Sequence, residues 1–179
     1  MYSADNSGFK EALHHQLKRL FEDKKVISIF TDEDDTDSFS TGILFDVTDC
    51  SIILAQISSK GLYDGYKFIQ VKNIYSIEYD GIYENKISTL YDIQKQKHKE
   101  IENLSNNSVT NLLEFAFLQK YVVSIELFES DLIDVEGIIE NVDQEAITLK
   151  MIDKYGEFEG YKLININDIT WMTFDTGTK

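Results

Sequence analysis

The sequence contains no proline and a single cysteine, Cys50, and long apolar runs are also missing. With one cysteine the chain can form no internal disulfide, so we expect a fold held by a hydrophobic core in a reducing compartment. No segment is apolar for long enough to suggest a membrane span, and residues 1–23 lack the apolar stretch of a signal peptide. We therefore expect a cytoplasmic protein with no membrane partner.

Basic residues are scarce too, with 17 Lys and Arg against 32 Asp and Glu, for a net charge of −15. Binding to nucleic acid draws much of its affinity from contacts with phosphates and therefore needs a basic footprint. On average this surface would repel RNA, so charge disfavours an RNA partner. A large net charge also serves solubility alone, because it keeps molecules apart.

The motifs of catalysis are missing as well. The chain has no glycine-rich phosphate loop, no nucleophile elbow and no His-Glu-x-x-His metal motif. His14 and His15 are adjacent on a predicted helix, point in different directions and make a poor metal-binding pair. The acidic run 32–37 offers oxygen ligands to Ca²⁺ but lacks the glycine of an EF-hand loop, which favours a solvated loop. We predict that the protein is not an enzyme and needs no cofactor or metal.

What the sequence does contain is an internal repeat. Residues 42–80 align without a gap with residues 137–175 at a constant offset of 95, and 13 of the 39 pairs are identical. A repeat of this length indicates one small structural unit used twice. The identical pairs include Gly61/Gly156 and the run Gly65-Tyr66-Lys67/Gly160-Tyr161-Lys162.

Each repeat is predicted to begin with an amphipathic helix and to continue with five short strands. Apolar residues follow helical spacing from Phe9 to Phe21 and again from Val109 to about Leu118. The helices match at an offset of 96, so we expect an extra residue in the first repeat before Gly42. Between the repeats, residues 83–104 show the thinner apolar stripe of a connector helix. In the second repeat the strands are predicted at 121–127, 135–142, 147–152, 160–166 and 170–174.

Residues 137–150 resemble a known sequence motif. The run Gly137-Ile138-Ile139-Glu140-Asn141-Val142-Asp143-Gln144, followed by Ile147, Leu149 and Lys150, resembles the first Sm motif of the Sm-like family, in particular its Hfq-like members. The resemblance implies small five-stranded barrels that associate edge to edge through their fourth and fifth strands. It also implies RNA binding, but the basic pair expected before the last strand is replaced by Asn167-Asp168 and by Lys72-Asn73.

Pattern and resemblance together predict a mostly β chain with helices: two tandem five-stranded Sm-like or SH3-like barrels, each preceded by an α-helix, joined by a connector helix. SH3-like barrels of other families share this pattern, so both names stay open. The predicted domains are residues 1–82 (helix and first barrel), 83–107 (connector helix) and 108–179 (helix and second barrel).

Candidate partner-binding residues lie mainly in two hairpins, 60–67 and 155–162, each of which places an aromatic and an acidic residue between two glycines. These aromatics are either anchors for a protein partner or covers of the barrel end beside glycines that the turn requires. A basic patch of Tyr66, Lys67 and Lys72, or of the connector lysines 95, 97 and 99, is a further alternative. The candidates are Tyr63, Tyr66, Lys67, Lys72, Phe158, Tyr161 and Lys162.

We therefore expect a non-enzymatic, acidic interaction or scaffold protein that binds protein or associates with itself. The alternative is an RNA-binding regulator of the Hfq-like type with a diverged RNA site.

Overall fold

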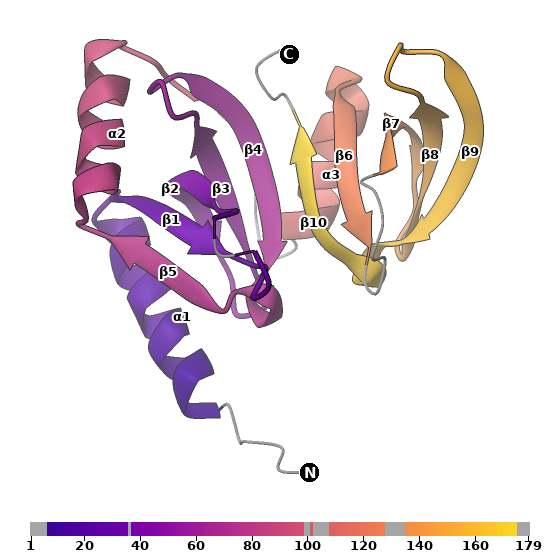
Figure 1. Cartoon of the computed structure of the whole chain (residues 1–179). Coiled ribbons are helices and arrows are strands. Elements are labelled where there is room, and N and C mark those ends of the chain that lie inside the picture. The colour runs from indigo at the N-terminus through magenta and orange to yellow at the C-terminus, as the bar shows by residue number, and fades with distance from the viewer. Residues whose placement is uncertain (1–6, 36, 99–100, 102–107, 128–134, 175–179) are drawn as a thin grey trace.

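Three helices and ten strands make up the described part of the chain, which comprises residues 7–35, 37–98, 101, 108–127 and 135–174. The computed structural model joins all ten strands into one antiparallel, unclosed sheet in the order β5-β1-β2-β3-β4-β10-β6-β7-β8-β9 (Figure 1). The first repeat therefore forms one half of the sheet and the second repeat the other half. In the described ranges, no helix has both the length and the apolar character needed to cross a membrane.

The elements follow the repeat. The first repeat consists of α1 (Ser7–Glu22), β1 (Val26–Phe30), β2 (Ser40–Val47), β3 (Ser51–Ile57), β4 (Tyr63–Gln70), the 3-10 turn η1 (Val71–Asn73) and β5 (Ser76–Tyr79). Helix α2 (Ile82–Ile93) follows it. The second repeat consists of α3 (Ser108–Gln119), β6 (Val122–Leu127), β7 (Val135–Val142), β8 (Ala146–Ile152), β9 (Phe158–Asn165), η2 (Ile166–Asp168) and β10 (Ile169–Phe174).

The two repeats pair their strands in the same register. Gly42 of β2 lies opposite Gln56 of β3, and Gly137 of β7 lies opposite Met151 of β8, 95 residues further along in both strands. Even the β-bulge recurs, directly after Leu44 in one repeat and after Ile139 in the other. A β-bulge bends its strand and is a specific feature of a fold. Its recurrence at the corresponding position shows that the two sequence repeats also have the same local structure.

The shared glycine of the second strand is explained by this bend. A Cβ atom at Gly42 would run into the carbonyl oxygen of Ala55, and one at Gly137 into that of Lys150. Only glycine allows the two backbones to approach so closely.

The prediction of two separate closed barrels is wrong. Strand β4 does not close a barrel within the first repeat but pairs with β10 of the second repeat, with Phe68 opposite Met172 and Tyr66 opposite Phe174. The sheet therefore runs through both repeats. Alternation of apolar and polar residues predicts where strands lie but not which strand pairs with which. In this chain the last strand of the second repeat, β10, pairs with β4.

The predicted connector helix is also too long. Helix α2 ends at Ile93, Lys95 has a left-handed backbone with φ of 51°, and residues 94–98 are not helical. His98 turns back toward the sheet, where its Nε2 atom lies 2.8 Å from the carbonyl oxygen of Gln56. Residues 99–100 and 102–107 of the predicted helix lie outside the described residues.

The hydrophobic core is continuous across the joint between β4 and β10. Tyr66 and Phe68 of β4 belong to the same buried cluster as Met172 and Phe174 of β10. Helix α3 packs on β7 of its own repeat and also reaches β3 of the first repeat, while α1 packs on β2 and α2 on β1. A second buried cluster lies under α1, around Leu17. The joint is thus formed by buried side chains as well as by backbone pairing.

Candidate interaction surface

Strand β9 is the outer edge of the second half of the sheet (Figure 1). It exposes three large apolar side chains. Phe158 is 56% exposed, Tyr161 63% and Leu163 73%. The rings of Phe158 and Tyr161 lie 5.2 Å apart, centroid to centroid, so the two side chains share one face of the strand. An edge strand also carries backbone groups that no neighbouring strand pairs, which makes it a template for an added strand.

Two of these three positions are buried in the first repeat. Tyr66, the counterpart of Tyr161, is 0% exposed, and Phe68, the counterpart of Leu163, is 3% exposed. Part of this cover comes from β10, whose Phe174 stacks on Tyr66 with ring centroids 5.5 Å apart, and Phe45 and His98 also pack against Tyr66. The exposed Tyr161 and Leu163 of β9 therefore correspond to side chains that lie opposite β10 in the first repeat.

Lys162 lies on the opposite face of β9. Its counterpart in the first repeat, Lys67, contacts the neighbouring strand β10. The Lys67 Nζ atom lies 4.3 Å from the ring centroid of Trp171 on β10 and donates a hydrogen bond of 3.0 Å to Ser40 Oγ. A cation over an aromatic ring is attracted by the ring's negative face. In the first repeat this lysine helps to fasten β4 to β10.

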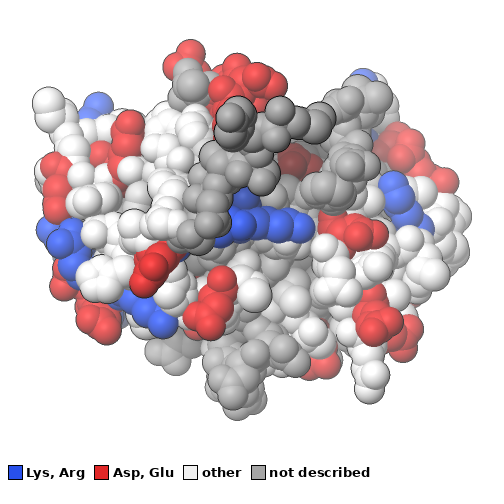
Figure 2. All heavy atoms as spheres, turned by 90° about the horizontal axis from the view of Figure 1, so that it is seen from below, with Lys and Arg blue, Asp and Glu red and all other residues white. Residues whose placement is uncertain are grey.

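The predicted basic patch of Tyr66, Lys67 and Lys72 does not form a surface for stacking bases. Tyr66 is fully buried and Lys67 is engaged with Trp171, while Lys72 lies exposed in η1. The face seen in Figure 2 shows acidic side chains in several places and no continuous basic area among the described residues.

No family model, curated protein or solved structure matches this chain.

The two predicted hairpins differ in exposure. Gly61 and Gly156 have φ of 73° and 83°, as expected for glycines that a turn requires. At Gly61 a Cβ atom would collide with Leu90 of α2, whereas at Gly156 nothing lies within 4 Å. Helix α2 thus covers the first hairpin, and in the second hairpin Tyr155 is 78% exposed. The hairpin is therefore packed under α2 in the first repeat and displays Tyr155 and Phe158 in the second.

An aromatic cluster around His98 was not foreseen from the sequence. The imidazole Nδ1 atom lies 2.7 Å from the Tyr91 hydroxyl, and the ring packs 4.8 Å from that of Tyr63. Burial lowers the pKa of His98, and its hydrogen bond with the carbonyl of Gln56 opposes this shift. The cluster forms because the chain returns to the sheet after α2 and places His98 beside Gln56 of β3. No local sequence pattern indicated this return.

The remaining polar groups have structural roles. Ser28 donates a hydrogen bond of 2.6 Å to the buried carboxylate of Glu84, which ties α2 to β1. Asp32 Oδ1 accepts hydrogen bonds from the backbone N–H groups of Asp34 and Asp35, which shapes the acidic loop. Among the described residues, no group of three or more His, Cys, Asp or Glu side chains is placed to hold a metal ion.

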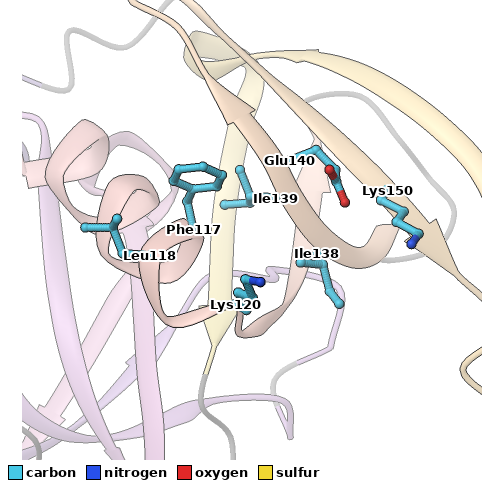
Figure 3. Close-up of a pocket in the computed structure, with 7 residues that line it drawn as sticks. All are labelled: Phe117, Leu118, Lys120, Ile138, Ile139, Glu140 and Lys150. Atoms are coloured by element: carbon cyan, nitrogen blue, oxygen red, sulfur yellow. The ribbon is translucent and has the colours of Figure 1, made fainter.

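An open groove of about 330 Å³ lies beside the end of α3 (Figure 3). Its apolar part consists of Phe117, Leu118, Ile138 and Ile139, and Lys120, Glu140 and Lys150 bring charges of both signs to it. Mixed charges on an open surface give no specific site for a small molecule, because such sites are concave with a few convergent polar groups.

Proposed function

We propose that this chain is a non-enzymatic interaction protein that binds a protein strand along the free edge of β9. The observation that carries this proposal is the exposed apolar row on β9, in which Tyr161 and Leu163 occupy positions whose counterparts, Tyr66 and Phe68, lie buried opposite β10. The pairing of β4 with β10 is an example of this binding mode within the chain, because it adds a strand to the fourth strand of a repeat.

Strand addition is a common way to bind a protein segment. Backbone hydrogen bonds of the added strand supply affinity, and pockets for alternate side chains supply specificity. The row on β9 adds apolar area of the kind that anchors protein interfaces, since aromatic residues are frequent among the residues that carry binding energy. The acidic charge of −15 agrees better with a protein partner than with nucleic acid.

The proposal includes a relationship to the Sm-like family. It is supported by the motif from Gly137 to Lys150, by the helix and five strands in each repeat, and by the glycine at the bend of the second strand. The edge contact that the resemblance implies, fourth strand to fifth strand, is the kind of contact that β4 and β10 make. The RNA site of that family is not part of the proposal, because Asn167-Asp168 replaces the basic pair.

A photo-crosslinking residue at position 161 tests this function in the full-length chain inside its own cells. We expect a discrete protein adduct, identified by mass spectrometry, because Tyr161 lies at the centre of the exposed row. The matched control is the same replacement at Tyr155, an aromatic residue of the same repeat that is even more exposed but lies in the hairpin. Equal labelling at the two positions, or none at 161, would contradict the proposal.

A further inference from the structure

Helix α2 covers a face of the first repeat that lies more open in the second. On this face Val26 of β1 and Ile57 of β3 form a buried cluster with Ile87 of α2. In the second repeat the corresponding residues are Val122 of β6 and Ile152 of β8. Val122 is 46% exposed, against 7% for Val26, and Ile152 is half-buried, against 3% exposure for Ile57. Apolar side chains that a helix buries in one repeat are therefore accessible in the other.

The same face carries one serine in each repeat, Ser28 on β1 and Ser124 on β6. Ser28 donates a hydrogen bond of 2.6 Å to the carboxylate of Glu84 on α2. The Oγ atom of Ser124 is also buried, but it has no hydrogen-bond partner among the described residues. A buried hydroxyl without a partner costs stability, and native structures contain few of them. Ser124 therefore marks the position at which a helix placed like α2 would bring a polar group.

The open groove beside α3 adjoins this face. Ile138, which lines the groove (Figure 3), lies opposite Val122 in the pairing of β7 with β6. At the far end of the face, a Cβ atom added at Gly61 would meet Leu90 of α2, whereas one added at Gly156 would meet no described atom within 4 Å. The second repeat thus offers the surface along which α2 lies in the first. We call this surface the helix track, and it comprises Val122, Ser124, Ile138, Ile152 and Gly156.

The polar end of the helix track differs in charge from its counterpart. Thr41 lies opposite Ser28 in the first repeat, whereas Glu136 lies opposite Ser124 in the second. A helix with the sequence of α2 would bring the carboxylate of Glu84 close to that of Glu136, and like charges placed together in an interface disfavour binding. A Lys or Arg side chain would instead donate a hydrogen bond to Ser124 and pair with the carboxylate of Glu136.

The other charges of this face agree with a basic helix. Glu126 follows Ser124 by two residues and therefore lies on the same face of β6. Lys150 lies opposite Ile138, further from Ser124, where the C-terminal half of the helix would lie. A cation is favourable near the C-terminus of a helix. The net charge of −15 favours approach of a basic partner.

We propose that the helix track binds a basic amphipathic helix of a partner protein, placed as α2 is placed on the first repeat. In α2, Glu84, Ile87 and Leu90 follow one another in steps of three. The partner helix therefore carries a Lys or Arg at the first of these positions and aliphatic residues three and six positions later. The helix track uses a face of β6 and β7 and not the edge of β9, so this interface goes beyond the function proposed above.

A peptide made from α2 serves as the probe. It has the sequence of residues 81–94 with Glu84→Lys, a fluorescent label, and a side-chain bridge between positions 85 and 89, which are exposed in α2, to hold the helix. Fluorescence anisotropy with the purified full-length chain should show saturable binding. The same bridged peptide with Glu84 retained should bind about tenfold more weakly, because its carboxylate meets Glu136.

Variants of the full-length chain locate the bound peptide. Val122→Asn places a polar group in the apolar part of the helix track and should weaken binding about tenfold or more. Ser124→Ala removes the partner of the lysine and should weaken it about three- to tenfold. Leu163→Asn makes a matched change on the exposed row of β9 and should leave binding unchanged. Circular dichroism checks that every variant is folded.

Three results would overturn the inference. The first is the absence of saturable binding. The second is equal or tighter binding of the peptide that retains Glu84, which would indicate an occupant like α2 itself. The third is binding that Leu163→Asn weakens and Val122→Asn does not, which would place the peptide on β9. The function proposed above is tested separately by the crosslink at position 161, so either proposal can fail while the other stands.

Discussion

His98 is a residue whose burial leads directly to a pH effect. The imidazole packs against Tyr63 and Tyr91 and bonds to the carbonyl of Gln56, so burial holds its pKa below the usual 6.5. The unfolded chain therefore binds a proton at His98 more readily than the folded chain does. Its contribution to stability is full above the ordinary pKa of 6.5 and is lost as the pH falls from 6.5 through the lower pKa of the folded chain.

This effect can be measured by urea denaturation at several pH values from about 8 to about 5, on either side of the ordinary histidine pKa. We expect the free energy of unfolding of the wild type to fall toward the acid end, and His98→Gln to reduce this dependence. His15→Gln removes an exposed histidine from α1 and should keep the wild-type dependence. Equal slopes for His98→Gln and the wild type would show that His98 is not the group responsible.

At the scale of the elements, the repeat offers a matched pair of tyrosines. Tyr66→Ala removes a buried ring from the joint between β4 and β10 and should cost about 3–5 kcal/mol, as large core truncations do. Tyr161→Ala removes the exposed counterpart from the edge strand and should change the stability of the dilute, monomeric chain by about 0.5 kcal/mol or less. The measurement is the free energy of unfolding in urea. Equal losses would mean that β10 does not protect Tyr66.

The same pair shows what sequence can and cannot predict about the elements. The strands of the second repeat were predicted to within two residues, because side chains that alternate in and out leave a pattern of period two. Tyr66 and Tyr161 share the local sequence Gly-Tyr-Lys, yet one is buried and the other is exposed. The difference arises from contacts with residues far along the chain, among them His98 and Phe174 of β10, so no local pattern contains it.

The candidate surface was likewise predicted in part. Phe158, Tyr161 and Lys162 were singled out because the repeat conserves their hairpin, and they lie on the free edge. Leu163 was missed, although its alternation with Tyr161 on one strand could have indicated it. The prediction of closed barrels was wrong, and the free edge at β9 was not predicted, for the same reason. Both depend on which strand pairs with β4, and the local sequence does not contain this information.

At the scale of the whole molecule, charge predicts the response to RNA. Labelled U-rich and A-rich RNA titrated with the chain at low salt should show no saturable change in fluorescence anisotropy. The net charge of −15 repels phosphates, and the only tyrosine of the predicted basic patch is buried. Low salt favours even weak phosphate contacts, so the absence of binding under this condition is the strictest test of the expectation. Saturable binding that weakens steeply with added salt, and that Lys72→Glu reduces, would contradict this expectation.

The joint between β4 and β10 also has a consequence for how the two halves of the sheet separate. It lies within one chain, so a joint that opens leaves its two strands tethered to each other. Tethered strands meet again at an effective concentration that the connecting segment sets, and dilution does not change it. Opening of the joint should therefore be independent of protein concentration, unlike the dissociation of two separate chains.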